Sequence, residues 1–238
     1  MKLIVINFLN IFDYFYKKQI IKALNSILGD NIEIFFDVGA HRGETIKLIL
    51  KNFKVKKIYA FEPLEKNFLF LKKNTLKLTY KNNIKLFNCA LAEKKEKRIM
   101  KEMKETSSST LNSIDETSRY FKRKNFFLNF SFKKSYYKEK KVSLEKAINI
   151  MINNNITSIE LLKIDTEGYE LNVIKGFENQ IKKIKVILFE HHYDLMIKKK
   201  YKFQDINRYL IKQGFIMKYK FKMPFRKTFE YVYLNQEF

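Results

Sequence analysis

Short apolar runs alternate with longer amphipathic segments along most of this chain. The apolar runs have the length and the residue types of buried strands, and the segments between them repeat their apolar positions at helical spacing. Such alternation predicts βαβ units, which build a buried, largely parallel sheet with helices on its faces. The predicted strands span 32–37, 58–62, 84–91, 159–165 and 185–190, the predicted helices about 45–52, 63–76, 171–177 and 204–213, and a closing hairpin 215–221 with 229–234.

The N-terminal segment predicts one more helix. Apolar residues from 3 to 28 leave a narrow polar face at helical spacing, and Gly29 is a stop signal, so we expect an N-terminal helical extension over 1–30. Its most apolar part, 3–16, is too short to span a membrane and lacks the cleavage site of a secretory signal, which favours a cytoplasmic protein. We expect this helix to pack on the domain, with a membrane-surface or oligomer contact as the alternative.

The segment 93–141 interrupts the alternation. It contains a serine cluster at 107–110 and a basic aromatic run at 119–141, with nine Lys or Arg residues against one Glu. A loop of this length inside a compact domain is usually a functional lid or a disordered insertion. After it, the sequence predicts a helix over 142–153, with Ser143 as its cap.

The composition narrows the function classes. The chain has 238 residues, of which 46% are hydrophobic, and this excludes general disorder. Its 48 Lys or Arg residues against 25 Asp or Glu give a net charge of +23, and nearly all of the basic residues are lysines. A chain of this charge binds polyanions without selectivity, so the charge alone does not indicate a nucleic-acid reader. The single cysteine, Cys89, excludes a disulfide scaffold and a zinc ribbon.

The loop after the first predicted strand is the first candidate site. Asp37 ends that strand, and Gly39 and Gly43 flank a short turn before the next helix, where glycine lets the backbone approach a ligand closely. Glu62 ends the second predicted strand, 25 residues after Asp37, where a carboxylate can accept both hydroxyls of a ribose. Together these features predict a nucleoside ligand, although the glycine spacing is neither that of dinucleotide enzymes nor that of a phosphate loop.

Further polar residues lie at the ends of the later strands. The amide of Asn88 would contact an adenine edge or serve only as a turn residue. Asp165 and Glu167 need separate roles, because repulsion between two buried carboxylates raises the pKa of one of them. We assign Asp165 to the cofactor or acceptor pocket and Glu167 to helix capping or acceptor positioning, with pure turn chemistry as the alternative. His191 is a candidate base or a surface residue, and no metal cluster is expected from three histidines.

The motifs occur in an order that is similar to one family. The chain reads FFDVGAHRGET at 35–45, AFEPLEKN at 60–67, NCAL at 88–91, SSTL at 108–111 and LKIDTEGYE at 162–170. In these motifs it resembles the FkbM family of S-adenosylmethionine-dependent methyltransferases. The resemblance implies the class I methyltransferase fold, a Rossmann-like three-layer α/β sandwich with a mostly parallel seven-stranded sheet whose last strand is antiparallel. Residues 31–238 would then form the methyltransferase domain, with a basic insertion at about 93–141.

The resemblance also implies a cofactor and the residues that hold it. The cofactor is S-adenosyl-L-methionine, with Gly39 facing its methionine part, Glu62 holding the ribose and Pro63 bordering the adenine. The cofactor-binding candidates are Asp37, Gly39, Ala40, His41, Gly43, Thr45, Glu62, Pro63, Asn88 and Ala90. The catalytic candidates are Asp165, Glu167 and His191, and a base that takes the proton of a hydroxyl acceptor contributes about 100-fold to the rate.

We therefore predict O-methylation of a hydroxyl on a glycan or a secondary metabolite. An RNA methyltransferase is the alternative that the +23 charge favours, but no Asn-Pro-Pro-Tyr-type tetrapeptide follows the fourth predicted strand. A noncatalytic cofactor-binding or membrane-surface module is the other alternative, and the intact glycine loop with Glu62 argues against it. The expected partner is a glycan or small-molecule acceptor, with no specific nucleic acid and with peripheral membrane contact as an option. The oligomeric state does not follow from the sequence.

Overall fold

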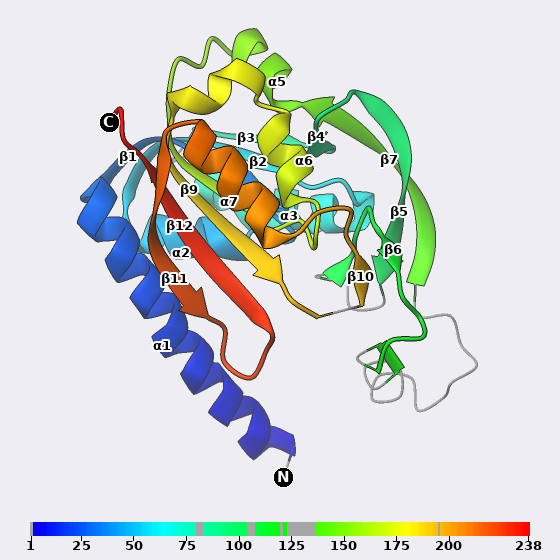
Figure 1. Ribbon diagram of the computed structural model, residues 1–238. Helices are drawn as coiled ribbons and strands as arrows, with labels where there is room; N and C mark the ends of the chain where they lie inside the picture. Colours follow the sequence, from blue (N-terminus) through cyan, green and yellow to red (C-terminus); the bar gives the residue numbers. More distant parts are fainter. Residues whose placement is uncertain (1, 80–82, 104–107, 120, 123–136, 195) are drawn as a thin grey trace.

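A seven-stranded sheet lies at the centre of the molecule (Figure 1). The computed structural model describes residues 2–79, 83–103, 108–119, 121–122, 137–194 and 196–238, and side chains from residue 12 onward. In this part of the chain the strand order is β11-β12-β9-β8-β1-β2-β3. The strands are β1 (Asn31–Val38), β2 (Lys54–Phe61), β3 (Asn83–Phe87), β8 (Ile159–Ile164), β9 (Ile184–His192), β11 (Phe215–Lys222) and β12 (Thr228–Asn235).

The directions of the strands confirm the predicted fold class. Strands β3, β2, β1, β8 and β9 are parallel to one another, whereas β12 is antiparallel to both of its neighbours, β9 and β11. The predicted closing hairpin is therefore β11 with β12, and its last strand is inserted between β9 and β11. This is the mostly parallel sheet with an antiparallel last strand that the sequence predicted.

Each central strand contributes side chains to two hydrophobic layers, because successive side chains of a strand point to opposite faces. In β1, Phe35 packs in one layer with Leu161 of β8, and Phe36 packs in the other layer with Leu162. The Phe35 face is covered by α1 (Lys2–Leu28), α2 (Glu44–Asn52) and α3 (Glu65–Thr79), and the Phe36 face by α5 (Ala147–Asn153), α6 (Glu170–Lys175) and α7 (Phe203–Lys212) (Figure 1).

The N-terminal helix α1 packs on the sheet. Tyr16, Ile20 and Leu24 follow one another at four-residue spacing and are buried against β9 and β12, together with Leu188 and Val232. Further along the hairpin, the rings of Phe12 and Phe225 meet edge to face, with 5.3 Å between their centroids. No helix among the described residues combines the length and the apolar character needed to cross a membrane.

The predicted strand over 84–91 was wrong, because the chain breaks it at Asn88. β3 ends at Phe87, and the next strand, β4 (Ala90–Ala92), belongs to a different sheet. The Asn88 side chain donates hydrogen bonds to the backbone carbonyls of Glu62 at 2.9 Å and Pro63 at 3.2 Å. These bonds fasten the turn to the end of β2, and the chain leaves the central sheet there.

The segment 93–141 was also predicted incompletely, because both of its described ends form strands. β5 (Glu96–Met103) pairs antiparallel with β7 (Tyr137–Lys146), and β4 joins β7 in a three-stranded sheet. The predicted helix over 142–153 therefore starts only at Ala147, since Val142 and Leu144 are buried in strand alternation with polar neighbours. Strands β6 (Ser113–Ile114) and β10 (Ile197–Lys198) also pair. Most of the basic run lies outside the described residues.

Candidate active site

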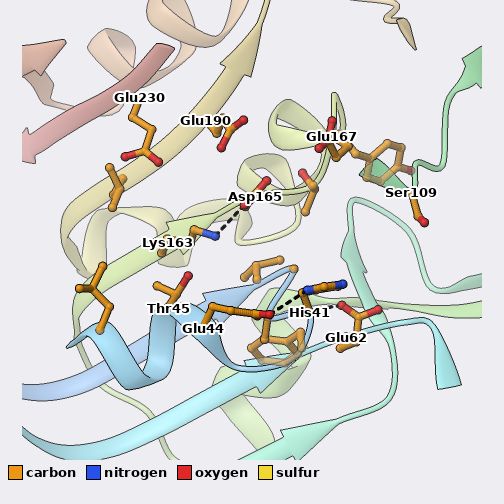
Figure 2. A pocket seen from close by; sticks show the side chains of 18 of the residues that line it. His41, Glu44, Thr45, Glu62, Ser109, Lys163, Asp165, Glu167, Glu190 and Glu230 are labelled. Carbon is orange, nitrogen blue, oxygen red and sulfur yellow. Dashed lines mark hydrogen bonds and ion pairs between the residues drawn. The ribbon is translucent and has the colours of Figure 1, made fainter. Parts of the chain in front are cut away.

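A cavity of about 510 Å³ lies at the carboxyl ends of β1, β2, β8 and β9, the edge where parallel α/β sheets bind ligands. Its walls come from the loop after β1, the end of β2, the loop after β8, helix α1 and the β11–β12 hairpin. Figure 2 shows His41, Glu44 and Glu62 toward one end, and Lys163, Asp165, Glu190 and Glu230 toward the other.

Most of the predicted site residues meet at this cavity. Nine of them line it: Gly39, Ala40, His41, Thr45, Glu62, Pro63, Ala90, Asp165 and Glu167. Four others, Asp37, Gly43, Asn88 and His191, are not among the described lining residues. The assignments to cofactor and acceptor stay predictions, but the geometry now separates side chains that a ligand can reach from those that support the walls.

Glu62 joins two loops at the end of the cavity that Gly39, His41 and Glu62 line. We call it the cofactor end, because the sequence predicts that the cofactor binds there. Its Oε2 accepts the backbone N–H of His41 at 3.0 Å, and its Oε1 accepts the backbone N–H of Leu64 at 3.0 Å. Burial raises the pKa of Glu62 to about 7, although these hydrogen bonds act in the opposite direction. A carboxylate has about four lone-pair sites. The side-chain amide of Asn67 donates to Oε1 at 3.5 Å, so Glu62 holds both loops and keeps one site for a ligand hydroxyl.

Gly39 lies against the loop that follows β8. Its φ of 83° is in the left-handed region, and a Cβ at this position would lie 1.9 Å from the backbone carbonyl oxygen of Asp165. Only glycine fits such a contact without moving backbone. The two loops that the sequence singled out, after the first and the fourth predicted strands, are therefore in direct contact.

A cluster of charged residues lies next to this contact: Lys163 and Asp37 are buried, and Asp165 is half-buried. Lys163 Nζ donates to Asp165 Oδ2 at 3.0 Å, and burial would lower the pKa of Lys163, but Asp165 and Asp37 raise it above its usual value. Asp37 is fully buried, and neither of its oxygens has a hydrogen-bond partner within the described part of the chain. Burial raises the pKa of Asp37 to about 6, while the charge of Lys163 opposes the shift. Lys163 thus fixes Asp165 and partly balances Asp37.

Sequence reasoning missed Lys163, Glu190 and Glu230. Lys163 could have been found, because residues two apart in a strand share a face, and Asp165 follows it at that spacing. Glu190 could have been found by the same rule, because it lies in β9 two residues after Leu188, which packs under α1. Glu230 has no such local signal. It reaches the cavity because β12 pairs with β9 in the register that sets Glu230 opposite Glu190.

The loop from Asp165 to Gly168 is held from both sides. Thr110 Oγ1 donates to the carbonyl of Glu167 at 2.7 Å, and Asn112 Nδ2 donates to the carbonyl of Gly168 at 2.5 Å. On the other side, the buried carboxylate of Glu170 accepts the N–H of Gly168 at 2.7 Å. The serine–threonine motif of the insertion therefore serves to position the loop that carries the candidate acids.

The two histidines of β9 lie on opposite faces. His191 packs among Tyr193, Tyr201 and Phe203, with Nδ1 3.6 Å from the buried Glu170, so its predicted role as a base does not fit this placement.

His192, on the face of Glu190, forms ion pairs with Glu190 at 2.9 Å and Glu167 at 3.2 Å. Burial would lower the pKa of His192, but Glu167, Asp194 and Glu190 raise it well above its usual value.

The remaining predicted residues support the walls. Gly43 precedes α2 with a φ of 87°, and Asn88 is bonded to the end of β2. Among the described residues, no group of three or more His, Cys, Asp or Glu side chains is arranged to hold a metal ion.

Comparison with known proteins identifies the family. The sequence profile of the methyltransferase FkbM domain matches residues 37–217, most of the chain. This chain belongs to the FkbM methyltransferase family. A comparison with curated proteins gave no match.

Solved methyltransferases share the fold. Methyltransferase FkbM from Methylobacillus flagellatus KT is similar with a TM-score of 0.55 and 15% identity, over 86% of this chain and 44% of that one. Magnesium protoporphyrin IX methyltransferase (ChlM) from Synechocystis PCC 6803, with bound SAM, gives 0.52 and 8%, over 95% and 81%. TrmK from M. capricolum, in complex with S-adenosylhomocysteine, gives 0.50 and 11%, over 91% and 67%. The chain thus spans less than half the length of the M. flagellatus protein, and these low identities show the fold alone.

The sequence predicts S-adenosylmethionine as the cofactor of this FkbM methyltransferase domain, and the ChlM structure contains bound SAM. The residues of the cavity fit such a group. Gly39 lets the backbone of its loop lie close to that of Asp165, and Glu62 keeps one acceptor site for a hydroxyl. Both residues line the cavity and would hold the cofactor, whereas the buried Asp37 lies behind the lining.

Proposed function

We propose that this FkbM protein methylates a hydroxyl group of a glycan or a small secondary metabolite. The observation that supports this is the charge of the cavity. Among the described residues that line it, seven are acids, Asp13, Glu44, Glu62, Asp165, Glu167, Glu190 and Glu230, against three Lys or Arg residues, Lys17, Lys163 and Arg226. Carboxylates accept hydrogen bonds from hydroxyls and repel phosphates, so the lining favours a polyhydroxylated acceptor over a polyanion.

The contrast with the whole chain strengthens this argument. The protein carries a net charge of +23, yet its cavity gathers acids from segments far apart in the sequence. The basic surface would attract the phosphates of a nucleic acid, but the acidic lining of the cavity would repel them. The acidic lining is therefore a feature of the site and does not follow from the composition.

When bound, S-adenosylmethionine supplies an activated methyl group on its sulfonium. The residues of this chain then orient the acceptor and exclude water, which are the main contributions to such a transfer. Lys163 holds Oδ2 of Asp165, which leaves Oδ1 for the proton of an acceptor hydroxyl. Thr110 and Asn112 fix the loop on which this carboxylate stands.

RNA methylation is the second candidate, because the basic surface would attract RNA and because TrmK has the same fold. Binding through this surface would be steeply salt-dependent and blind to sequence. Tight binding to one RNA that persists at raised salt would move this candidate to first place.

The test is transfer of a tritiated methyl group from S-adenosylmethionine into cell-extract fractions of glycan, lipid, RNA and small molecules. We expect the label in the glycan or small-molecule fraction, resistant to ribonuclease and stable to alkali as an ether. Label confined to RNA would contradict the proposal. Folded protein that binds S-adenosylhomocysteine but labels no fraction would instead favour a noncatalytic module.

A further inference from the structure

We propose that the cavity binds an ammonium group of the acceptor between Glu190, Glu230 and Tyr16, next to the hydroxyl that receives the methyl group. The acceptor class is then an amino sugar or another amine-bearing polyol. This inference rests on the proposed function and specifies its substrate. We call the part of the cavity lined by Tyr16, Asp165, Glu190 and Glu230 the acidic end.

Two carboxylates, those of Glu190 and Glu230, lie opposite each other at the acidic end. Glu190 and Glu230 are register partners across the antiparallel strands β9 and β12, and both line the cavity. Side chains in such a pair start about 4.5–5.5 Å apart at Cβ, and like charges at this distance are destabilising. Figure 2 shows both carboxylates at the end of the cavity where Lys163 and Asp165 also lie. In the free cavity a proton on Glu230 relieves this repulsion. A cation between Glu190 and Glu230 would take the place of that proton, whereas a neutral hydroxyl would not.

In the part of the chain that the structure describes, the neighbouring cations pair with Asp165 and Glu190 but not with Glu230. Lys163 donates to Asp165, and His192 pairs with Glu190 and Glu167. No ion pair among the described residues includes Glu230. Burial and the charge of Glu190 raise the pKa of Glu230 to about 8, which is the behaviour of an acid without a counter-ion. The charged or titratable groups around Glu230 are Asp13, Tyr16 and Lys17 of α1, Lys163 and Asp165 at the end of β8, Glu190 of β9 and Arg226 of the hairpin.

Tyr16 gives an independent observation that points to a ligand. It is only 7% exposed, lines the cavity from α1, and its hydroxyl has no hydrogen-bond partner of good geometry within the described residues. A buried hydroxyl without a partner costs free energy until a ligand fills the place. An ammonium group meets all these requirements at once, since it donates three hydrogen bonds and carries positive charge.

The acidic end is built partly from segments outside the family domain. Tyr16 and Glu230 lie outside residues 37–217, the span that matches the methyltransferase FkbM profile, whereas Gly39 and Glu62 of the cofactor end lie inside it. The acceptor specificity proposed here therefore belongs to this chain and does not follow from membership of the family.

The first experiment removes the amine from the acceptor. The glycan and small-molecule fractions of an extract are treated with acetic anhydride under aqueous conditions that acylate amines and spare hydroxyls, and are then offered with tritiated S-adenosylmethionine. We expect acetylation to abolish labelling, and we expect the untreated acceptor to be retained on a cation exchanger. The labelled product should carry its methyl group on oxygen, as determined by mass-spectrometric fragmentation.

The second experiment uses matched variants of the protein. Glu230→Gln and Glu190→Gln should each lower kcat/KM for the untreated acceptor by about tenfold or more, the scale of one charge-assisted hydrogen bond. The KM for S-adenosylmethionine should change little in both variants. The melting temperature should change little in Glu230→Gln near neutral pH, because glutamine keeps the shape of a protonated glutamate. Glu190→Gln should also lose some stability, because it breaks the ion pair with His192. The control is Glu33→Gln, an exposed acid paired with Lys56 at 2.8 Å.

The outcomes separate the two proposals. Labelling that survives acetylation would overturn the ammonium site and leave hydroxyl methylation standing. A methyl group on nitrogen would also overturn it, because the amine would then be the nucleophile. Full activity of both glutamine variants would show that these acids do not contact the acceptor. Label in RNA alone, or in no fraction, would end the proposed function and this inference together.

Discussion

The carboxylate of Glu62, at the end of β2, accepts the backbone N–H of His41 in the loop after β1, at 3.0 Å. The same carboxylate accepts the N–H of Leu64, so two loops of the cofactor end depend on one buried side chain. The sequence assigns Glu62 to the ribose alone. The structure adds a role in holding the two loops, and the contact with the ribose stays a prediction.

Replacing Glu62 should therefore weaken cofactor binding and also destabilise the protein. Glu62→Ala leaves two backbone donors without their acceptor, and each unsatisfied buried group costs about 1–3 kcal/mol. We expect the affinity for S-adenosylhomocysteine to fall at least tenfold in calorimetry and the melting temperature to fall by several degrees. Glu65→Gln, an exposed acid on the adjacent helix, is the control and should change neither. An unchanged affinity for Glu62→Ala would show that this acid does not contact the cofactor.

Substitution of Gly39 tests the contact between the two loops. In Gly39→Ala the new Cβ would lie 1.9 Å from the carbonyl oxygen of Asp165, so one of the loops has to move. Gly29→Ala is a matched control, because Gly29 also has a positive φ, of 67°, but a methyl group added there would have no atom within 4 Å.

Both substitutions carry the left-handed backbone cost of about 1–2 kcal/mol, and only Gly39→Ala adds a collision. We expect Gly39→Ala to lose S-adenosylhomocysteine binding and more stability than Gly29→Ala, as measured by urea denaturation and calorimetry. Equal losses in the two variants would contradict the close approach of the loops.

The stability of the ligand-free protein should fall as pH rises. Burial raises the pKa of Asp37 to about 6, Glu62 to about 7 and Glu230 to about 8. In the unfolded chain these groups titrate near pH 4, so between about pH 4 and 8 the folded state binds more protons than the unfolded state. His192 acts in the same direction, because its raised pKa gives stability below about pH 6.5 that is lost as pH rises through the folded value.

We expect the free energy of unfolding to be at least about 1 kcal/mol lower at pH 8 than at pH 6, since one pKa unit corresponds to about 1.4 kcal/mol. Urea denaturation at a series of pH values measures how the free energy of unfolding depends on pH. In Glu230→Gln this free energy should fall less steeply near pH 8. Stability that is constant or rising from pH 6 to pH 8 would show that these acids are ionised and balanced in the folded protein.

Asp165→Asn should separate turnover from cofactor binding. The substitution keeps the size of the side chain but removes the proton acceptor, so we expect turnover to fall about 100-fold, the usual scale for a positioned base. It also removes the charge that Lys163 faces at 3.0 Å, so some loss of stability is expected as well. Affinity for S-adenosylhomocysteine should stay within a few-fold. If binding is lost instead, Asp165 belongs to the cofactor pocket, and Glu190 becomes the candidate base.

The central sheet could be predicted from sequence because its strands carry apolar runs on both faces, as in Phe35 and Phe36 of β1. The errors arose where tertiary contacts decide the local structure. The apolar run through 84–91 reads as one strand, but the amide of Asn88 is bonded to the end of β2 and divides it. Val142 and Leu144 fit a helix or a strand, and pairing with β4 and β5 selects the strand.

That Gly39 and Glu62 lie together at one cavity was also predictable, because each directly follows a strand of the parallel sheet. The acidic end was not. Glu230 faces Glu190 only through the register of a hairpin whose pairing no local pattern fixes. Lys163 precedes Asp165 at strand spacing but was overlooked. In a chain with so many lysines, one lysine within an apolar run does not by itself indicate a buried charge.

The side chains of β9 place Glu190 in the cavity and its neighbour His191 in the opposite layer. A single-residue insertion or deletion within β9 would exchange the two, because every side chain beyond it changes face. The same change in β12 would turn the side chain of Glu230 away from the cavity, although the composition of the protein would be almost unaltered. Related enzymes with other acceptors should therefore differ by substitution at these two positions, or by the length of the hairpin turn, and keep the lengths of both strands constant.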